Sequence, residues 1–262
     1  MQQLFELTDH GPDTFVGSGL AYPWGGLYGG HIVAQAFLAT AKTVDPEFLP
    51  HSLRAYFIRR GDSSEPIRYE VDRTRNGRSF CTRRVVARQA NGVILNLESS
   101  FQRVEPAPDV QAIHMPTVVT SPADTPSSSW SPLFDRRIVH SETIIAPVNA
   151  WMKIVDDLGD DPVLQAAALA YVSDDVPFDA VNRLHPKYVE LPPGVEDDLT
   201  GASLDHSIWF HRPIRADRWH LHHLACHSLT GSRGLAIGQV FSEAGVHIAS
   251  VAQEFLCRQL RH

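Results

Sequence analysis

Cysteine is scarce in this chain of 262 residues, which has three, at Cys81, Cys226 and Cys257. They lie far apart in the sequence and form no Cys-X-X-Cys pair, so neither a zinc cluster nor a disulfide framework is indicated. An odd number of cysteines in a chain of this length is typical of reduced, buried thiols. It therefore predicts an intracellular protein, located in the cytoplasm.

Long apolar runs are also missing. No stretch of 18 apolar residues occurs, and the beginning "MQQLFELTDHGPDTF" has neither a basic start nor an apolar core. We therefore expect neither a signal peptide nor membrane insertion. Basic residues are in the minority, with 23 against 30 acidic ones and a net charge of −7. This balance argues against nucleic acid or an anionic membrane as a partner.

Several signatures of active sites are absent as well. The chain has no GxSxG motif of a serine-nucleophile hydrolase, no GxGxxG motif and no P-loop. Histidines gather between positions 220 and 227, and His220 and His222 would share one face of a strand. No carboxylate or cysteine at ligand spacing completes a site there. The sequence therefore predicts neither a metal nor a cofactor.

What the sequence does contain is an internal repeat. Residues 56–103 align without a gap with residues 209–256, at a constant offset of 153. The identities are few, and the shared strand pattern and turn glycine carry more weight. In each copy two runs rich in β-branched and aromatic residues flank a turn, at Asn91-Gly92 and at Ala244-Gly245. Such patterns predict two long hairpins. The matched positions are Tyr56/Trp209, Phe57/Phe210, Arg59/Arg212, Ser79/Ser232, Gly92/Gly245 and Val93/Val246.

Each copy is preceded by a segment that predicts an almost entirely apolar helix, near 30–44 and 162–173. The second follows Asp161, a good N-cap, and begins with Pro162, which suits a first helical position. A helix without a polar face must be buried on most sides. We therefore predict an α+β fold in which each of two tandem units wraps a long antiparallel sheet around one central helix. The predicted limits are 1–104 and 133–262, with a linker rich in proline and serine at 105–132.

The motifs of the chain resemble those of the type II acyl-CoA thioesterase family, whose members are double hot-dog proteins. The similar stretches occur in order and cover nearly the whole chain apart from the linker. They are "YGGHIVAQAF", "HSLRAYFIRRGD", "RTRNGRSFCTRRVVARQ", "LESSFQ", "AYVSD", "SLDHSIWFHRP" and "SVAQE".

The resemblance implies three catalytic residues: Asp174 in "YVSD", Ser203 in "SLDHS" and Gln253 in "VAQE". It also implies hydrolysis of acyl-CoA to a free fatty acid and CoA without a covalent intermediate, by one water that these residues bind and activate. The chain departs from the family pattern at His31, where many relatives have glutamine. It also has a long segment between Asp174 and Ser203.

The residue types fit this chemistry, although each also has a simpler interpretation. Asp174 can act as a general base, or it can be a surface carboxylate at the end of a helix. Gln253 shares a strand face with apolar residues, so its amide needs a partner if it is buried. The glycines before His31 can bring unpaired backbone N–H groups close to a ligand. The N–H groups of Gly30 and His31 are therefore predicted to bind the oxyanion, the alternative being a tight turn.

Two other functions remain open at this stage. His31 at a helix start is compatible with a hot-dog hydratase or dehydratase acting on an enoyl thioester, and a non-catalytic acyl-CoA-binding protein is the second alternative. The offset of 153 matches Ser203 with Pro50 and Gln253 with Ser100, which predicts one active site per chain. The sequence leaves open the length and branching of the acyl chain. It also leaves open a homodimer or a higher homo-oligomer.

Overall fold

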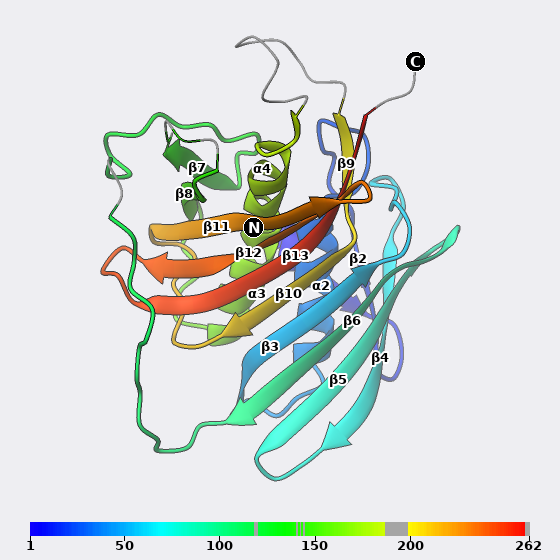
Figure 1. The fold of residues 1–262 in the computed structure, drawn as a ribbon. Helices are drawn as coiled ribbons and strands as arrows, with labels where there is room; N and C mark the ends of the chain where they lie inside the picture. Colours follow the sequence, from blue (N-terminus) through cyan, green and yellow to red (C-terminus); the bar gives the residue numbers. More distant parts are fainter. Residues whose placement is uncertain (118–119, 140, 142, 144, 187–198, 260–262) are drawn as a thin grey trace.

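A computed structural model describes the chain except for residues 118–119, 140, 142, 144, 187–198 and 260–262 (Figure 1). The part of the chain that it describes forms one antiparallel sheet of 13 strands, which curves around two central helices. None of the described helices is long and apolar enough to cross a membrane.

The first half of the chain supplies one central helix and six strands. Its elements are α1 (Gln2–Phe5), β1 (Leu7–Asp9), β2 (Thr14–Gly17), α2 (Gly29–Ala41), β3 (Phe48–Phe57), β4 (Ile67–Asn76), β5 (Phe80–Gln89) and β6 (Gly92–Arg103). The second half repeats this plan with one more strand, and its short helix follows the central helix instead of preceding it. Its elements are β7 (Phe134–Val139), β8 (Val148–Ile154), α3 (Pro162–Ser173), α4 (Val176–Asn182), β9 (Leu199–Ser203), β10 (Asp205–Phe210), β11 (His220–Thr230), β12 (Arg233–Ser242) and β13 (His247–Gln259).

The two central helices are buried, as their apolar sequences predict. Every residue from 30 to 40 in α2 is buried, and in α3 the same holds from 165 to 173. The start of α3 at Pro162 is confirmed, and Asp161 Oδ1 accepts hydrogen bonds from the N–H groups of Val163 and Leu164 at 2.8 and 3.3 Å. These bonds satisfy two of the donors that a helix start leaves unpaired.

The predicted end of the first helix, at residue 44, is wrong, because α2 ends at Ala41. Beyond that residue the backbone forms turns in which each N–H bonds to the carbonyl oxygen three residues earlier. The N–H of Thr43 donates to Thr40 O at 3.1 Å, and the N–H of Val44 donates to Ala41 O at 3.0 Å. The Thr43 hydroxyl also donates to Thr40 O, at 2.8 Å. Threonine hydroxyls compete in this way with the helical ladder.

The two predicted hairpins are confirmed as β5–β6 and β12–β13. Gly92 and Gly245 in their turns have positive φ angles of 110° and 81°, which glycine adopts without strain. The strands β5 and β12 have equivalent limits, since residues 80–89 become 233–242 when the offset of 153 is added. The repeat seen in the sequence is therefore a repeat of structure.

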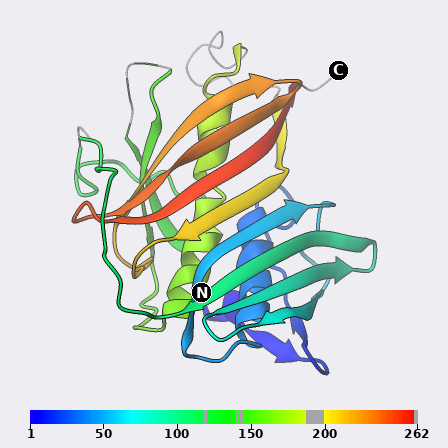
Figure 2. The ribbon, with the colours of Figure 1, turned by 60° about the horizontal axis from the view of Figure 1, so that its bottom comes forward.

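Strands β3 and β10 join the two halves into one sheet. The strand order is β1-β2-β4-β5-β6-β3-β10-β13-β12-β11-β8-β7, with β9 pairing with β13. At the junction Arg54 pairs with Ser207, and the offset of 153 makes these two residues equivalent. An approximate two-fold axis therefore passes between β3 and β10. Figure 2 shows the strands of both halves side by side in one curved surface.

This arrangement confirms the predicted architecture, with two tandem units whose sheets lie side by side. The unit limits 1–104 and 133–262 and the linker at 105–132 stay a prediction. The backbone between β6 and β7 has no helix or strand among its described residues.

Candidate active site

Asp174 lies at the C-terminal end of α3, and only Asp175 separates it from the short helix α4. It is the C-cap of α3 and keeps helical backbone angles, φ −75° and ψ −10°. Only 4% of its surface is exposed, because the beginning of α2 packs against this end of α3. The carboxylate is thus inside the protein and not on the surface of a helix end.

The structure brings Ser203 and Gln253 into contact with Asp174. Ser203 Oγ donates to Asp174 Oδ1 at 2.9 Å, and Gln253 Nε2 donates to the same oxygen at 2.8 Å. Gln253 Nε2 also lies 2.8 Å from Ser203 Oγ. Three side chains that are far apart in the sequence therefore form one cluster.

The strands explain how Ser203 and Gln253 reach this position. Ser203 is the last residue of β9 and pairs with Phe255 of β13. The alternation expected along β13 is confirmed, since residues 247, 249, 251, 253 and 255 are all buried. Gln253 is completely buried on this face, so its amide has to find hydrogen-bond partners inside the protein.

The paired glycines at the start of α2 allow a close contact between the two helices. The N–H of Gly30 donates to Asp174 Oδ2 at 2.8 Å. A Cβ atom on Gly30 would lie 2.1 Å from the carbonyl oxygen of Tyr171, and one on Gly29 would lie 2.5 Å from Asp174 Oδ2. The glycines are therefore needed for close packing of α2 against the end of α3, and not only for the tight turn that the sequence also suggested.

His31 lies beside this cluster but uses its polar atoms elsewhere. Its backbone N–H donates to the carbonyl oxygen of Tyr28 at 3.1 Å. Its ring nitrogens lie 2.8 Å from the Tyr22 hydroxyl and 3.0 Å from the Ser18 carbonyl oxygen. Burial lowers the pKa of the His31 ring to about 4. Of the two backbone N–H groups predicted for the oxyanion, only that of Gly30 therefore contacts the cluster.

Burial also controls the charge of Asp174. Removal from water disfavours the ionised carboxylate and raises its pKa to about 7, although the hydrogen bonds from Ser203, Gln253 and Gly30 act in the opposite direction. A carboxylate with such a pKa exchanges a proton near neutral pH, as a general base must.

A charged network that the sequence did not reveal lies directly behind Asp174. Asp175 accepts a hydrogen bond from Trp130 Nε1 at 2.7 Å and forms an ion pair with Arg136 at 2.7 Å. Arg136 also pairs with Asp179 of α4. Burial raises the pKa of Asp175 to about 6, while the charge of Arg136 opposes this shift. The only signal in the sequence was a second acidic residue next to Asp174.

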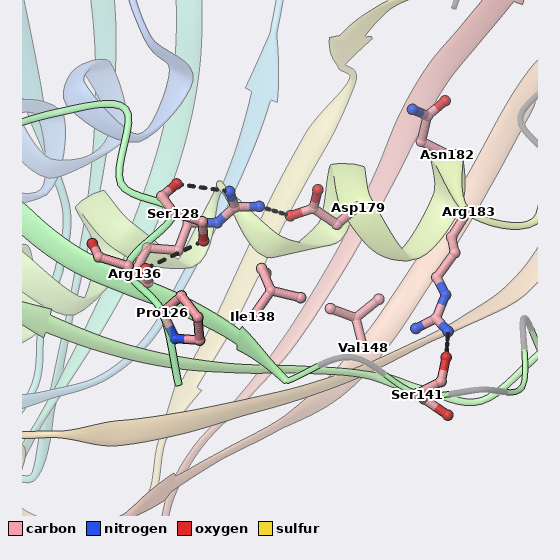
Figure 3. Close-up of a pocket in the computed structure, with 10 residues that line it drawn as sticks. Pro126, Ser128, Arg136, Ile138, Ser141, Val148, Asp179, Asn182 and Arg183 are labelled. Atoms are coloured by element: carbon pink, nitrogen blue, oxygen red, sulfur yellow. Dashed lines mark hydrogen bonds and ion pairs between the residues drawn. The ribbon is translucent and has the colours of Figure 1, made fainter. Parts of the chain in front are cut away.

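Figure 3 shows the Arg136–Asp179 part of this network at the wall of a cavity of about 580 Å³ beside α4. Arg136 extends toward Asp179, and Arg183 donates to the carbonyl oxygen of Ser141 at 3.1 Å. The walls come mainly from α4, β7, β8 and the segment before β7. Both arginines at the cavity therefore have partners in the protein.

The histidines of the second half do not form a metal site in the part of the chain that the structure describes. His220 and His222 are buried side by side on β11, with ring centres 5.1 Å apart. Among the described residues, no group of three or more suitable side chains surrounds a point where an ion could bind. His206 instead contacts the cluster itself, since its Nδ1 lies 2.5 Å from Gln253 Oε1.

Family models and known proteins match nearly the whole chain. Residues 20–102 match a model described as the acyl-CoA thioesterase N-terminal domain, and residues 109–257 match the corresponding C-terminal domain. Human acyl-coenzyme A thioesterase 8 is 33% identical, with 94% of this chain and 85% of the human protein covered. Acyl-CoA thioesterase 2 of Haemophilus influenzae is 33% identical, with coverage of 88% and 87%.

Solved structures agree with these matches. The acyl-CoA thioesterase II TesB2 of Mycobacterium marinum has a TM-score of 0.85 at 35% identity, covering 99% of this chain and 98% of that one. A protein from Alicyclobacillus acidocaldarius, described as having a hot dog fold, has a TM-score of 0.78 at 21% identity, with coverage of 99% and 98%. The second likeness concerns the fold alone. Together with the sheet described above, it confirms the predicted double hot-dog architecture.

Proposed function

The chain belongs to the acyl-CoA thioesterase family and is an acyl-CoA thioester hydrolase, and from this premise we propose how it works. One site per chain hydrolyses acyl-CoA to a free fatty acid and CoA, using a water activated by Asp174 with Ser203 and Gln253. The observation that carries the proposal is the contact of these three side chains at 2.8–2.9 Å around a buried carboxylate.

In the proposed reaction Asp174 removes a proton from the water as its oxygen attacks the thioester carbonyl carbon. Gln253 Nε2 and the Ser203 hydroxyl orient the water, since an amide and a hydroxyl offer the hydrogen-bonding groups it needs. The C–O bond forms, the C–S bond then breaks, and the protonated carboxyl of Asp174 returns the proton to the sulfur of CoA. No covalent intermediate with the protein is needed. A general base of this kind contributes on the order of 10²–10⁴ in rate.

For the oxyanion we propose the backbone N–H groups of Gly30 and His31. The start of a helix carries unpaired donors and a partial positive charge, which stabilise a developing negative charge. Both groups have acceptors in the free protein, namely Asp174 Oδ2 and Tyr28 O. The substrate oxygen therefore has to replace these acceptors. Protonation of Asp174 during the reaction weakens the first of the two bonds and so favours the exchange.

The two alternative functions receive less support. A hydratase or dehydratase would need His31 at the reacting carbon, but its ring nitrogens bind Tyr22 and Ser18. A non-catalytic binding protein would not need to keep a buried, partly neutralised carboxylate with two polar partners. Burying such groups has an energetic cost that function would have to justify.

A thiol-release assay with short, medium, long and branched acyl-CoAs tests the proposal. We expect release of free CoA, with Asp174→Asn as the matched inactive control. With a 2-enoyl-CoA as the substrate, loss of enoyl absorbance without thiol release would indicate the hydratase instead. Binding without either change would indicate the non-catalytic protein.

We also propose that the reaction belongs to fatty acid metabolism in the cytoplasm. The proposed product is a free fatty acid, and the three scattered cysteines fit a reducing compartment. Acyl-chain length and oligomeric state are measured independently, by the panel above and by light scattering.

A further inference from the structure

His206 lies buried between Gln253 of the active-site cluster and Ser173, the residue directly before Asp174. It stands in β10, one residue before Ser207, which pairs with Ala252 of β13. The side chain is completely buried. Its Nδ1 lies 2.5 Å from Gln253 Oε1, and its Nε2 lies 2.9 Å from Ser173 Oγ.

The contacts of Gln253 determine which ring nitrogen of His206 carries the hydrogen. Gln253 Nε2 lies 2.8 Å from Asp174 Oδ1, and an ionised carboxylate can only accept hydrogen bonds. The amide NH₂ group must therefore face Asp174, which leaves Oε1 toward His206. An amide oxygen also only accepts, so His206 Nδ1 must be the donor.

The other ring nitrogen then has a defined partner as well. Burial lowers the pKa of His206 to about 4, so the ring is neutral near pH 7. A neutral ring with hydrogen on Nδ1 accepts at Nε2. The Ser173 hydroxyl, whose oxygen lies 2.9 Å from Nε2 and 3.3 Å from the carbonyl oxygen of Ala170, supplies its hydrogen at the shorter of these two contacts. The resulting chain of hydrogen bonds runs from Ser173 through His206 and Gln253 to Asp174. Ser173 is the residue directly before Asp174, so this path of hydrogen bonds starts and ends on neighbouring residues.

We propose that His206 is a positioning residue that holds the Gln253 amide with its NH₂ group toward Asp174 and Ser203. The Ser173 hydroxyl fixes the tautomer of His206 that this requires. Without the His206 donor, the amide can rotate and place its oxygen against the carboxylate. His206 does not act as an acid or base, because both ring nitrogens are engaged by Gln253 and Ser173. The proposal rests on the proposed function for its effect on rate.

The effect on rate is tested with two variants of His206. His206→Leu removes the donor, and we expect kcat to fall by up to about tenfold, the loss expected for Gln253→Ala, because His206 acts through Gln253. KM should change less than about threefold. The low-pH limb of the rate profile should also move to higher pH, because Asp174 loses a hydrogen bond that favours its ionised form. In His206→Asn the amide nitrogen Nδ2 is a hydrogen-bond donor. It is attached to Cγ, as Nδ1 is in histidine. We expect it to restore the limb and most of kcat.

Three further variants separate this role from simple packing. His222→Leu is the matched control, since His222 is equally buried but its ring nitrogens have no hydrogen-bond partner among the described residues. It should leave kcat and the limb unchanged. Ser173→Ala should act like His206→Leu but more weakly. In a Gln253→Ala protein, His206→Leu should have almost no additional effect on kcat, because residues that act through one another are not additive.

The proposal is overturned if His206→Leu lowers kcat equally with and without Gln253. It is also overturned if a folded His206→Asn protein behaves like His206→Leu. Should His206→Leu fail to fold, Ser173→Ala is measured in its place. It should move the low-pH limb of the rate profile in the wild-type protein but not in the Gln253→Ala protein, and an equal shift in both would overturn the proposal.

A measurement without substrate tests the geometry separately. Nitrogen NMR of ¹⁵N-histidine-labelled protein should show a neutral Nδ1–H ring, identified as the signal missing from His206→Asn. An Nε2–H tautomer or a charged ring above pH 7, where Asp174 is ionised, would contradict the positioning role. Failure of the proposed function is recognised differently, because the wild-type protein would then release no thiol from any acyl-CoA while the tautomer is still measured.

Discussion

The two halves of the molecule have equivalent strands but different side chains at the positions that matter. Ser203 and Gln253 of the second half correspond to Pro50 and Ser100 of the first, at the offset of 153. Proline offers no hydroxyl, and the Ser100 hydroxyl is engaged by His51 Nε2 at 2.8 Å. The first half therefore lacks both groups that are proposed to orient the water.

The ends of the two central helices show the same contrast between the two halves. The C-cap of α3 is the buried Asp174, whereas the C-cap of α2 is Lys42, which is exposed and pairs with Asp9 at 3.7 Å. At the helix starts, the N–H of Gly30 reaches Asp174 in the other half. The equivalent N–H in α3, that of Val163, is used by its own N-cap, Asp161. The first half thus contributes backbone, and the second contributes side chains.

A duplicated unit can lose one copy of a costly polar site without losing function, because buried polar groups need partners. The first half has polar groups in its interior, but they satisfy one another. Arg83 is only 2% exposed and donates to Thr43 Oγ1 at 2.8 Å and to Asn76 Oδ1 at 2.7 Å. It also donates to backbone carbonyl oxygens. These contacts stabilise the fold, whereas those of the second half surround a carboxylate.

The largest effect should come from Asp174→Asn. The change keeps the shape of the side chain but removes the base, so we expect kcat to fall by about 10² or more with little change in KM. Steady-state thiol release measures this. A folded variant with about half the wild-type rate would reveal a second site in the first half.

Smaller losses should follow from Ser203→Ala and Gln253→Ala. Each removes one group that orients the water, and we expect about a tenfold loss of kcat from each. Combined with Asp174→Asn, either change should add far less than its single effect, because all three residues act on one water. Full additivity in these double variants would contradict a shared water.

The pH dependence of activity follows from the pKa of Asp174, which burial raises to about 7. The base works when ionised, so kcat/KM should rise with pH through about 7 and level off above it. A profile that is flat from pH 5 to pH 9 would contradict the assignment of Asp174 as the base.

Stability should depend on pH in the opposite direction. The folded-state pKa of Asp174, about 7, lies above the ordinary value of 3.8, so folding favours its protonated form. The resulting stability is fully present below about pH 4 and is lost as the pH rises through about 7, an amount on the order of 4 kcal/mol. The melting temperature should therefore fall more between pH 5 and pH 8 in wild type than in Asp174→Asn. An equal fall in both proteins would show that Asp174 does not titrate in this range.

The smallest effect is expected in the first half. Ser100→Ala changes the counterpart of Gln253 but touches no group of the proposed site. We expect kcat to stay within about twofold of wild type, as is usual away from functional groups. A loss comparable to that of Gln253→Ala would remove the contrast between the two halves.

The sequence revealed the fold more completely than the site. The turn glycines, the Asp161 cap and the apolar helices are local signals in the sequence. The offset of 153 seen in the sequence also relates β5 to β12 and Arg54 to its pairing partner Ser207 in the structure. The proposed catalytic residues could be named only through the resemblance to a family. Their supporting contacts, from Arg136 to Asp175 and from His206 to Gln253, link distant segments with no pattern between them. The end of α2 could not be predicted from periodicity, because the apolar pattern does not show that the Thr43 hydroxyl bonds to the carbonyl oxygen of Thr40.

The central claim is that each chain has one active site, made of side chains from the second half and backbone from the first. A crystal structure of the Asp174→Asn protein with octanoyl-CoA tests it most directly. We expect one acyl-CoA per chain, with its thioester carbonyl beside position 174, Ser203 and Gln253 and its oxygen toward the start of α2. A thioester bound instead beside Pro50 and Ser100, or at both places, would contradict the account.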